Sequence, residues 1–405
     1  MTTIQVITAI IVVLIYAAIA IGRVPLLRMN RATIALAGAA ILVAVGAITE
    51  HEAIASLDMG TILLLGAMMV VNVNLRMAGF FRFVTSRTLR LANNPRTLLA
   101  LVIFSAGILS AIFLNDTICL MLTPLVVDIT QRLERNPLPY LVALAAATNI
   151  GSVATITGNP QNLIIGQASG IPYLTFLAHL GPVALIGMVI CWGVVMLVYP
   201  AEFRTALPQV RLPPPRPSTP LLARTVLVVA GLMVAFLAGV SVVTAACVAA
   251  ALLLISRLRP VKLLALDWDL LAFFAGLFAV TGAIEATGLS EMLFEAFAPV
   301  LQSGLVSFSL LVGILSNTVS NVPAVLLLRP EIAAFPDPRQ TWLALAMAST
   351  LAGNFTLLGS AATLIVAEVA SQHGARLSFG AYLRAGIPIT VLTMLAGIVW
   401  LGLTT

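Results

Sequence analysis

Apolar runs of about 20 residues recur from one end of this 405-residue chain to the other. That is the length an α-helix needs to cross the ~30 Å hydrocarbon core of a bilayer. Hydrophobic residues make up 60% of the chain and charged residues only 9%, whereas a soluble domain carries roughly 25% charged residues. The runs therefore predict an all-α polytopic membrane protein.

Ten segments fit a membrane-spanning helix, and two of them are long enough to contain a break. They are 3–22, 32–49, 59–80, 140–170, 178–199, 223–239, 242–257, 269–288, 341–371 and 383–403. A proline-rich polar stretch, 201–222, separates residues 1–200 from residues 223–405. This composition predicts an extended linker between two halves of the protein.

Two further stretches, 97–131 and 297–328, do not fit a single crossing. The first holds 35 apolar-rich residues between Arg96 and Arg132. A continuous helix of that length would measure about 52 Å, which exceeds one ~30 Å hydrocarbon core and falls short of two. We therefore predict a re-entrant hairpin in each stretch, with both of its ends on the same side of the membrane.

The positions of the basic residues predict the orientation of the chain. With the N-terminus outside and two hairpins that do not cross, 19 of the 21 Lys and Arg residues face the cytoplasm. Only Arg329 and Arg339 then lie outside. This distribution satisfies the positive-inside rule. It places the proline-rich linker in the cytoplasm, and we expect the chain to reside in a prokaryotic plasma membrane.

The two halves contain an internal repeat. "GILSAIFLNDTICLMLTP" (107–124) and "GILSNTVSNVPAVLLLRP" (313–330) are identical at eight of 18 positions. "ALAAATNIGSVATITGNPQNLII" (143–165) and "ALAMASTLAGNFTLLGSAATLIV" (344–366) are identical at eight of 23. Each half would hold five crossings and one hairpin. Because five is odd, the halves would have inverted topology, as in many secondary transporters.

The segments 140–170 and 341–371 are predicted to be broken helices. Pro160 lacks a backbone donor and clashes with the preceding turn of a helix, and Gly158 lies beside it in "TITGNPQN". We expect a break near 155–160, and a matching one within "GNFTLLGSAATL" (353–364). Unpaired backbone at membrane depth is tolerated only where it lines a site or cavity. Matching interruptions in two halves therefore indicate a transporter's binding site.

The candidate binding site combines the two hairpin tips with the two broken helices. Its amides and hydroxyls can bind an anion or a neutral solute, and Na⁺ is expected near Asn115, Asp116 and Gly158. An alternative is that Asn115, Asp116 and Thr117 merely cap a helix, although a charge at mid-membrane costs roughly 2.5–3.5 kcal/mol. The candidate residues are Asn115, Asp116, Thr117, Thr155, Thr157, Gly158, Asn159, Asn162, Asn317, Thr318, Ser320, Asn321, Asn354, Thr356, Gly359, Ser360 and Thr363, with Pro160 at the break.

Other classes of function fit the sequence less well. An enzyme would need a nucleophile with a base or a metal cluster, and the chain has no HExxH motif and no paired histidines. Hairpins that enter from opposite faces argue against a continuous channel. No basic patch is interleaved with stacking aromatics, so no nucleic acid partner is expected. The sequence predicts no cofactor, only Na⁺ or H⁺ as a coupling ion.

At these residues the chain resembles the ion transporter superfamily, which includes arsenite permeases, sodium/proton antiporters, citrate transporters and divalent anion/sodium symporters. "NDTICLMLTPLV" and "SNVPAVLLL" look like the hairpin tips of arsenite-permease-like members. "TNIGSVATITGNPQNLIIG" is similar to the broken-helix motif of citrate-transporter-like members. The resemblance implies an elevator-type secondary transporter, commonly a homodimer, in which a transport domain moves against a scaffold.

The tips depart from one branch of that superfamily. In its carboxylate symporters each tip reads Ser-Asn-Thr, whereas here the tips are Leu114-Asn115-Asp116 and Ser320-Asn321-Val322. The Asp116 carboxylate would repel a dianion unless a cation or proton intervenes. We expect a transporter of small inorganic or organic anions, coupled to protons or sodium through Asp116. The alternatives are an arsenite or antimonite efflux permease and a sodium/proton antiporter.

Overall fold

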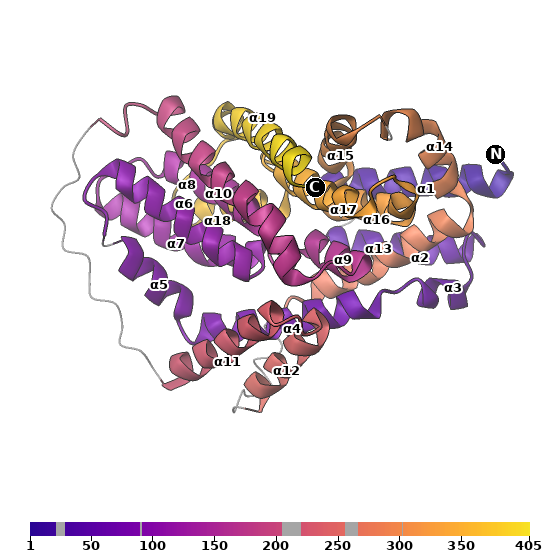
Figure 1. The fold of residues 1–405 in the computed structure, drawn as a ribbon, viewed down its shortest axis with the longest axis horizontal. Helices are drawn as coiled ribbons and strands as arrows, with labels where there is room; N and C mark the ends of the chain where they lie inside the picture. The colour runs from indigo at the N-terminus through magenta and orange to yellow at the C-terminus, as the bar shows by residue number, and fades with distance from the viewer. Residues whose placement is uncertain (22–28, 90, 205–219, 256–265, 302) are drawn as a thin grey trace.

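The computed structural model describes residues 1–21, 29–89, 91–204, 220–255, 266–301 and 303–405. Over these residues the chain forms α-helices joined by short connections (Figure 1). The N-terminal helices are α1 (Thr3–Ile21), α2 (Arg31–Ala44), α3 (Glu50–Ala55), α4 (Met59–Met77), α5 (Phe80–Leu89), α6 (Pro95–Ile112), α7 (Asn115–Arg132), α8 (Pro137–Ser152), α9 (Pro160–Ser169) and α10 (Tyr173–Val198).

The second half is equally helical. It contains α11 (Pro220–Leu237), α12 (Val242–Leu254), α13 (Trp268–Ala286), α14 (Leu289–Leu301), α15 (Leu305–Val319), α16 (Asn321–Leu328), the 3-10 helix η2 (Arg329–Ala334), α17 (Pro338–Ala352), α18 (Ala361–Gln372) and α19 (Phe379–Thr404). Seven of the described helices, α1, α4, α6, α10, α11, α13 and α19, are long and apolar enough to cross a membrane. The prediction of an all-α membrane protein is confirmed.

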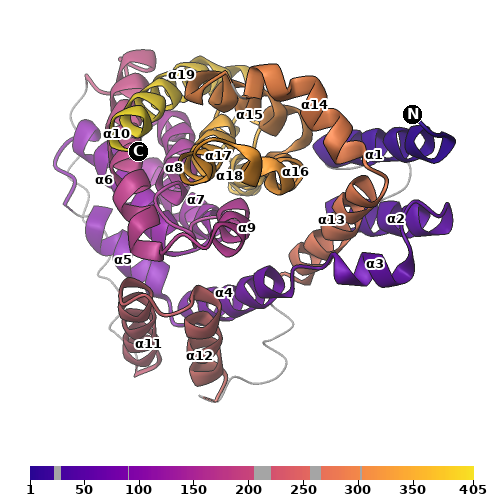
Figure 2. The ribbon, with the colours of Figure 1, turned by 45° about the vertical axis from the view of Figure 1, so that its right-hand side comes forward.

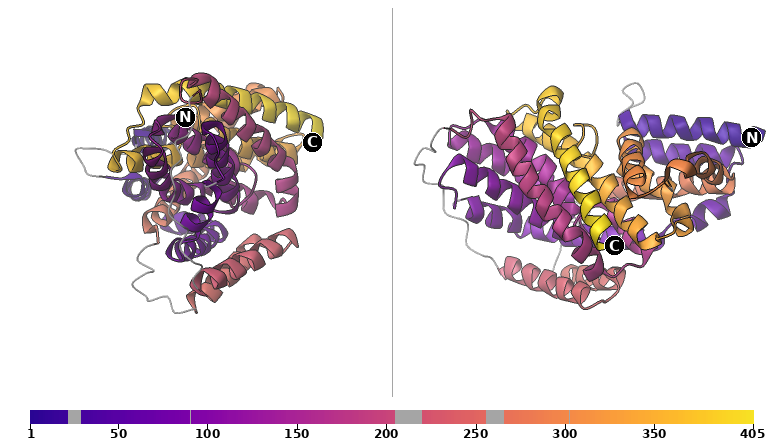
Figure 3. Two further views of the ribbon diagram at one scale, coloured as in Figure 1. Left: turned by 90° about the vertical axis from the view of Figure 1, so that its left-hand side faces the viewer. Right: turned by 45° about the horizontal axis from the view of Figure 1, so that its top comes forward.

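The helices form two groups at opposite ends of the molecule. Helices α6, α7, α8, α10 and α18 pack together at one end, and α1, α2, α3 and α13 at the other (Figures 1 and 2). Helix α4 packs against the α11–α12 pair, which lies at the lower edge of the molecule in both views of Figure 3. Most of the predicted linker, 201–222, lies outside the described residues.

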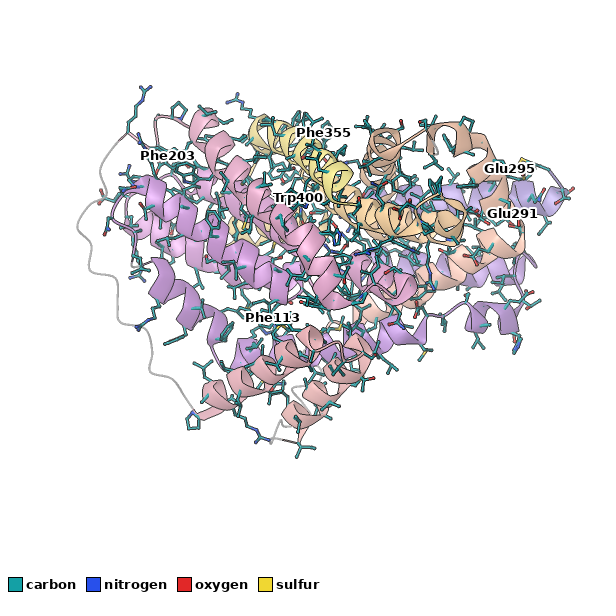
Figure 4. The ribbon with its side chains drawn as sticks, viewed as in Figure 1. Phe113, Phe203, Glu291, Glu295, Phe355 and Trp400 are labelled. Carbon is teal, nitrogen blue, oxygen red and sulfur yellow. The ribbon has the colours of Figure 1, made fainter. Side chains whose placement is uncertain are left out.

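Several elements differ from the segments expected from hydropathy. The run 32–49 forms a helix only to Ala44, because the chain turns at Gly46 with φ +76°. The predicted hairpin 297–328 does not begin at 297: its first arm is α15, and α14 precedes it as a separate helix. Glu291 and Glu295 of α14 are exposed at the end of the molecule near the N-terminus (Figure 4).

Four helices begin with an asparagine or aspartate followed by proline. The first residue accepts a hydrogen bond from a backbone N–H of the opening turn, and the proline occupies the first helical position, where no donor is needed. Pro160 therefore starts α9 and does not kink a continuous helix, which corrects the reason for the predicted break. The pairs are Asn94-Pro95, Asn136-Pro137, Asn159-Pro160 and Asp337-Pro338.

Glycines bring the first hairpin against the first broken helix. A Cβ at Gly151 of α8 would overlap the backbone carbonyl of Gly107 in α6. Backbone atoms cannot give way as a flexible side chain can, so the two helices pack this closely only with glycine at 151. The contact positions the tip of the α6–α7 hairpin beside the break in α8–α9.

Replacing Gly151 by alanine should therefore destabilise the fold. We expect Gly151→Ala to lower the free energy of unfolding by about 1–3 kcal/mol, the usual range for overpacking. Gly193→Ala in α10 is the control, because the added carbon would meet no atom within 4 Å beyond its chain neighbours and the nearby backbone of its own helix. Thermal unfolding in detergent measures both, and equal melting temperatures for the two variants would contradict the role given to Gly151.

Candidate solute and ion site

The tip of the first hairpin is bonded to the first broken helix. The chain reverses between α6 and α7 at Phe113 and Leu114. The backbone N–H of Asn115 donates to the carbonyl of Gly158 at 2.9 Å, and its Nδ2 donates to Oδ1 of Asn149 at 3.1 Å. The helix-capping position is Leu114, whose side chain makes no cap. Asn115 therefore joins two elements, which a simple helix cap would not do.

Aromatic rings hold the same tip from the other side. The ring of Phe113, labelled in Figure 4, packs edge-on against Phe80 and Phe81 at the start of α5, with centroids 5.9 and 5.7 Å away. Phe81 and Phe113 are almost completely buried. The tip therefore has an apolar support on one side and a polar contact on the other.

The second hairpin tip contacts the second broken helix at the repeat-related residues, through a side-chain amide where the first tip uses a backbone N–H. Helix α15 passes into α16 at Ser320, which has φ +80°. With its amide oriented to satisfy both ends, Asn321 donates to the carbonyl of Gly359 at 3.3 Å. Asn115 and Asn321 occupy the same position of the internal repeat, and so do Gly158 and Gly359.

Two further contacts recur at repeat-related positions. The hydroxyl of Ser110 donates to the carbonyl of Thr148 at 2.6 Å, and the hydroxyl of Ser316 donates to the carbonyl of Ser349 at 2.9 Å. Likewise Asn159 caps α9 and Ser360 caps α18. Each hairpin is thus bonded to its own broken helix at repeat-related positions. The inverted orientation of the two halves remains a prediction.

The two broken helices are bonded to each other in a reciprocal manner. Nδ2 of Asn149 donates to the hydroxyl of Ser360 at 2.9 Å, and Nδ2 of Asn159 donates to the hydroxyl of Thr350 at 3.2 Å. Asn149 corresponds to Thr350 in the repeat, and Asn159 corresponds to Ser360. The same pair of positions therefore meets twice, as expected around a local two-fold axis.

The seven-residue connection 153–159 satisfies its own backbone. Nδ2 of Asn162 donates to the carbonyls of Ser152 and Thr155 at 3.0 and 2.9 Å. The hydroxyl of Thr155 donates to the carbonyl of Ala111 in α6, and the hydroxyl of Thr157 lies 3.3 Å from that of Tyr173. The two bonds from Asn162 pair carbonyls that the break leaves without a helical partner, as a dry environment requires. The bonds of Thr155 and Thr157 tie the connection to α6 and α10.

The connection 353–360 is held by similar bonds. The hydroxyl of Thr363 donates to the carbonyl of Leu357 at 2.9 Å, and Nδ2 of Asn317 donates to the carbonyl of Ala352 at 2.9 Å. Asn354 accepts a hydrogen bond from Asn149 at 2.9 Å. Thr356 lies in this connection and is half-buried. Thr318 is set apart, because its exposed hydroxyl donates to Ile314 of its own helix.

Asp116 is the one charged residue in the two tips and the two connections. Its side chain is partly buried beside Asn115, and among the described residues the carboxylate has no hydrogen-bond donor. Of the charged groups in the described part of the chain, Asp267, which caps α13, and Arg31, the first residue of α2, act electrostatically on it. A carboxylate with such surroundings can bind a proton or a small cation.

Sequence reasoning missed several polar residues that the structure brings to this region. Asn149 and Thr350 connect the broken helices, and Gln161 also donates to the Thr350 hydroxyl at 3.1 Å. Asn149 and Thr350 lie at corresponding positions of the internal repeat, and both are polar within apolar segments. That pattern could have marked them as site residues.

Two amide oxygens, of Asn162 and Asn317, are buried without a hydrogen-bond partner in the described part of the chain. Such oxygens can accept from a solute or coordinate a cation.

Comparison with known proteins gives a family for the chain. Residues 11–352 match the family CitMHS, described as citrate transporter. The silicon efflux transporter LSI3 of Oryza sativa subsp. japonica is 30% identical, over 94% of each chain. A 46 kDa membrane protein of Mycobacterium leprae is 31% identical, over 92% of this chain and 94% of its own.

A solved structure has the same fold. The crystal structure of the Alcanivorax borkumensis YdaH transporter, reported to have an unusual topology, aligns with a TM-score of 0.55 over 99% of this chain and 98% of its own. The two sequences are only 15% identical. The likeness therefore supports the fold alone and carries no statement about solute or ion.

The bonds to Thr350 give a direct test of the contact between the broken helices. Thr350→Val keeps the side-chain volume but removes the acceptor of the Gln161 amide, and it leaves the Asn159 amide with only the Ser152 hydroxyl as an acceptor. We expect it to reduce the free energy of unfolding by about 1–3 kcal/mol, the cost of unpaired buried donors. Thr350→Ser keeps the hydroxyl and should stay close to wild type. Denaturation in detergent measures both, and a loss in Thr350→Ser as large as in Thr350→Val would argue against the contact.

Proposed function

The chain belongs to the citrate transporter family, and on that premise we propose that it is a secondary active transporter of a small oxyacid or its anion. Transport is driven by a gradient of protons or sodium ions. The two halves, 1–200 and 223–405, supply the tips and broken helices that hold the solute. The moving parts act by an elevator-type mechanism within a homodimer.

The charge of the site is the main support for this proposal, and it restricts the class of solute that the site can bind. The only charged side chain of the two tips and the two connections is the carboxylate of Asp116, and the rest are amides, hydroxyls and apolar groups. A polyanion such as citrate would be repelled by that carboxylate. A neutral hydroxylated acid would instead find donors and acceptors without an electrostatic cost. Silicic and arsenous acids are of this kind, and the similarity to a silicon efflux transporter supports the class.

Asp116 is the proposed coupling group. It is a single ionisable residue at the tip of a hairpin that is bonded to the broken helix through Asn115. Binding of a proton or Na⁺ would neutralise it, and an uncharged tip can pass through a low-dielectric region at lower cost than a charged one. The ion and the solute would then cross together or in exchange.

Two other functions have specific support. Arg31 acts electrostatically on Asp116, and a cation there could offset the carboxylate enough to admit an organic anion. Alternatively, the carboxylate could carry the ions by itself, which would make the chain a sodium/proton antiporter. Arsenite or antimonite efflux falls within the proposed class of neutral solutes.

The orientation is part of the proposal. The N-terminus lies outside, and the proline-rich linker lies in the cytoplasm of a prokaryotic cell. The 19 of 21 Lys and Arg residues on the cytoplasmic side support it. The ion pair between Arg329 and Asp58, 3.1 Å apart, fits this topology because both residues are assigned to the outer face.

Neutralising Asp116 should abolish coupled transport without unfolding the protein. In proteoliposomes we expect Asp116→Asn to lose solute movement driven by a proton or sodium gradient, because the variant cannot change charge. The assay adds silicic or arsenous acid to the proteoliposomes and measures the accumulated silicon or arsenic by mass spectrometry. Citrate and succinate are the comparison anions, and their accumulation is measured as the intact molecules.

The matched control is Asp128→Asn, the same chemical change on the same helix. Asp128 is exposed and paired with Arg132 at 2.8 Å on the helix surface, a bond of small energetic value. Its variant should transport as wild type does. Retained gradient-driven transport in Asp116→Asn would refute the coupling role, and accumulation of citrate in place of the neutral acids would refute the solute class.

A further inference from the structure

Helix α4 carries two buried asparagines in an otherwise apolar spanning segment. Asn72 is 3% exposed and Asn74 is 1% exposed. The amide nitrogen of Asn74 donates within its own helix, to the carbonyl of Val70 at 2.8 Å. The amide nitrogen of Asn72 instead donates to another helix, to the hydroxyl oxygen of Thr117 in α7 at 3.4 Å. Asn72 is thus directed at the tip of the first hairpin.

The carbonyl oxygen of Asn72 has no hydrogen-bond partner among the described residues, although it is buried. Leaving a buried polar atom unpaired costs about 1–3 kcal/mol. A polar group without a partner beside a binding site is the arrangement expected when the partner is the bound molecule. Thr117 is the residue next to Asp116, so the side-chain amide of Asn72 lies beside the tip that carries the only charge of the site.

We propose that Asn72 is a solute-positioning residue, whose Oδ1 accepts a hydrogen bond from a hydroxyl of the bound acid. The solute would then lie between α4 and the first hairpin tip. This rests on the proposed function and specifies its solute further, because an acceptor at this point requires a hydrogen-bond donor. A protonated oxyacid has such a hydroxyl, whereas a fully ionised inorganic oxyanion or succinate has none.

The proposal also gives the solute a contact with α4, a helix outside the hairpins and the broken helices. Helix α4 belongs to neither hairpin and to neither broken helix, and it packs mainly against α12. Asn72 would be the contribution of this helix to a site otherwise formed by the tips and the connections. Its sequence segment, "MMVVNVNLRM" (68–77), shows two asparagines but does not show which one faces the hairpin.

The two asparagines provide a matched pair of variants. Asn72→Leu and Asn74→Leu make the same change, two residues apart on one helix, and each removes a buried amide with an unpartnered oxygen. In proteoliposomes with silicic acid as the probe, we expect Asn72→Leu to raise the KM about tenfold, the loss of one good hydrogen bond. The maximal rate should change less than about twofold, and Asn74→Leu should leave the KM near wild type.

A purely structural role for Asn72 would give a different result. It would lower the amount of active protein, and hence the maximal rate, without changing the KM, or it would affect both variants equally. Either result overturns the inference while leaving the proposed function intact. If Asn72→Leu does not fold, Asn72→Ser replaces it, because its shorter hydroxyl cannot reach the same solute atom and the KM should still rise. Wild-type protein that fails to move silicic, arsenous or any comparison acid would overturn the proposed function itself.

Discussion

Backbone groups in the middle of a bilayer must find hydrogen-bond partners within the protein, and most of this structure depends on that constraint. The two broken helices leave several such groups unpaired. Asn159 and Ser360 accept from N–H groups in the first turns of α9 and α18, and Asn162 and Thr363 donate to carbonyls of the connections. The interruptions are therefore stable only because amides and hydroxyls replace the helical bonds.

The same polar groups set the chemistry available to a solute. Donors such as the amide of Asn149 already form hydrogen bonds to the other half of the protein. These bonds rigidify the region and leave few polar atoms free to bind a solute. The free positions are mostly acceptors, and they include the Asp116 carboxylate. A site rich in acceptors with one carboxylate suits a hydroxylated solute and a cation or proton, and it disfavours a polyanion. The apolar ring contacts of Phe113 keep the hairpin tip in place beside this site.

Much of this arrangement can be read from the sequence, for reasons that differ between elements. The hairpin tips and the breaks follow from the repeat and from residues such as Gly158, where the backbone of Ser152 leaves no room for a side chain. The sequence did not predict that Pro160 starts a helix. A proline at the first position of a helix and a proline that kinks a helix give the same local sequence, and only the capping bond of Asn159 distinguishes them. Helix α14 was missed because short surface helices lack the long apolar run of a crossing. The pairing of Asn149 with Ser360 and the direction of Asn72 depend on how helices pack, which no local pattern contains.

The most direct test of the account is whether an ion gradient drives accumulation of a neutral oxyacid. Proteoliposomes containing the wild-type protein would be given silicic acid at equal concentration on both sides, with a proton gradient or a sodium gradient imposed across the membrane. The account predicts that one of the gradients moves the acid to a higher concentration on one side, and that dissipating the gradient abolishes the difference. Acid that stays at equal concentration under both gradients, while still exchanging across the membrane, would contradict it and would indicate a passive pathway.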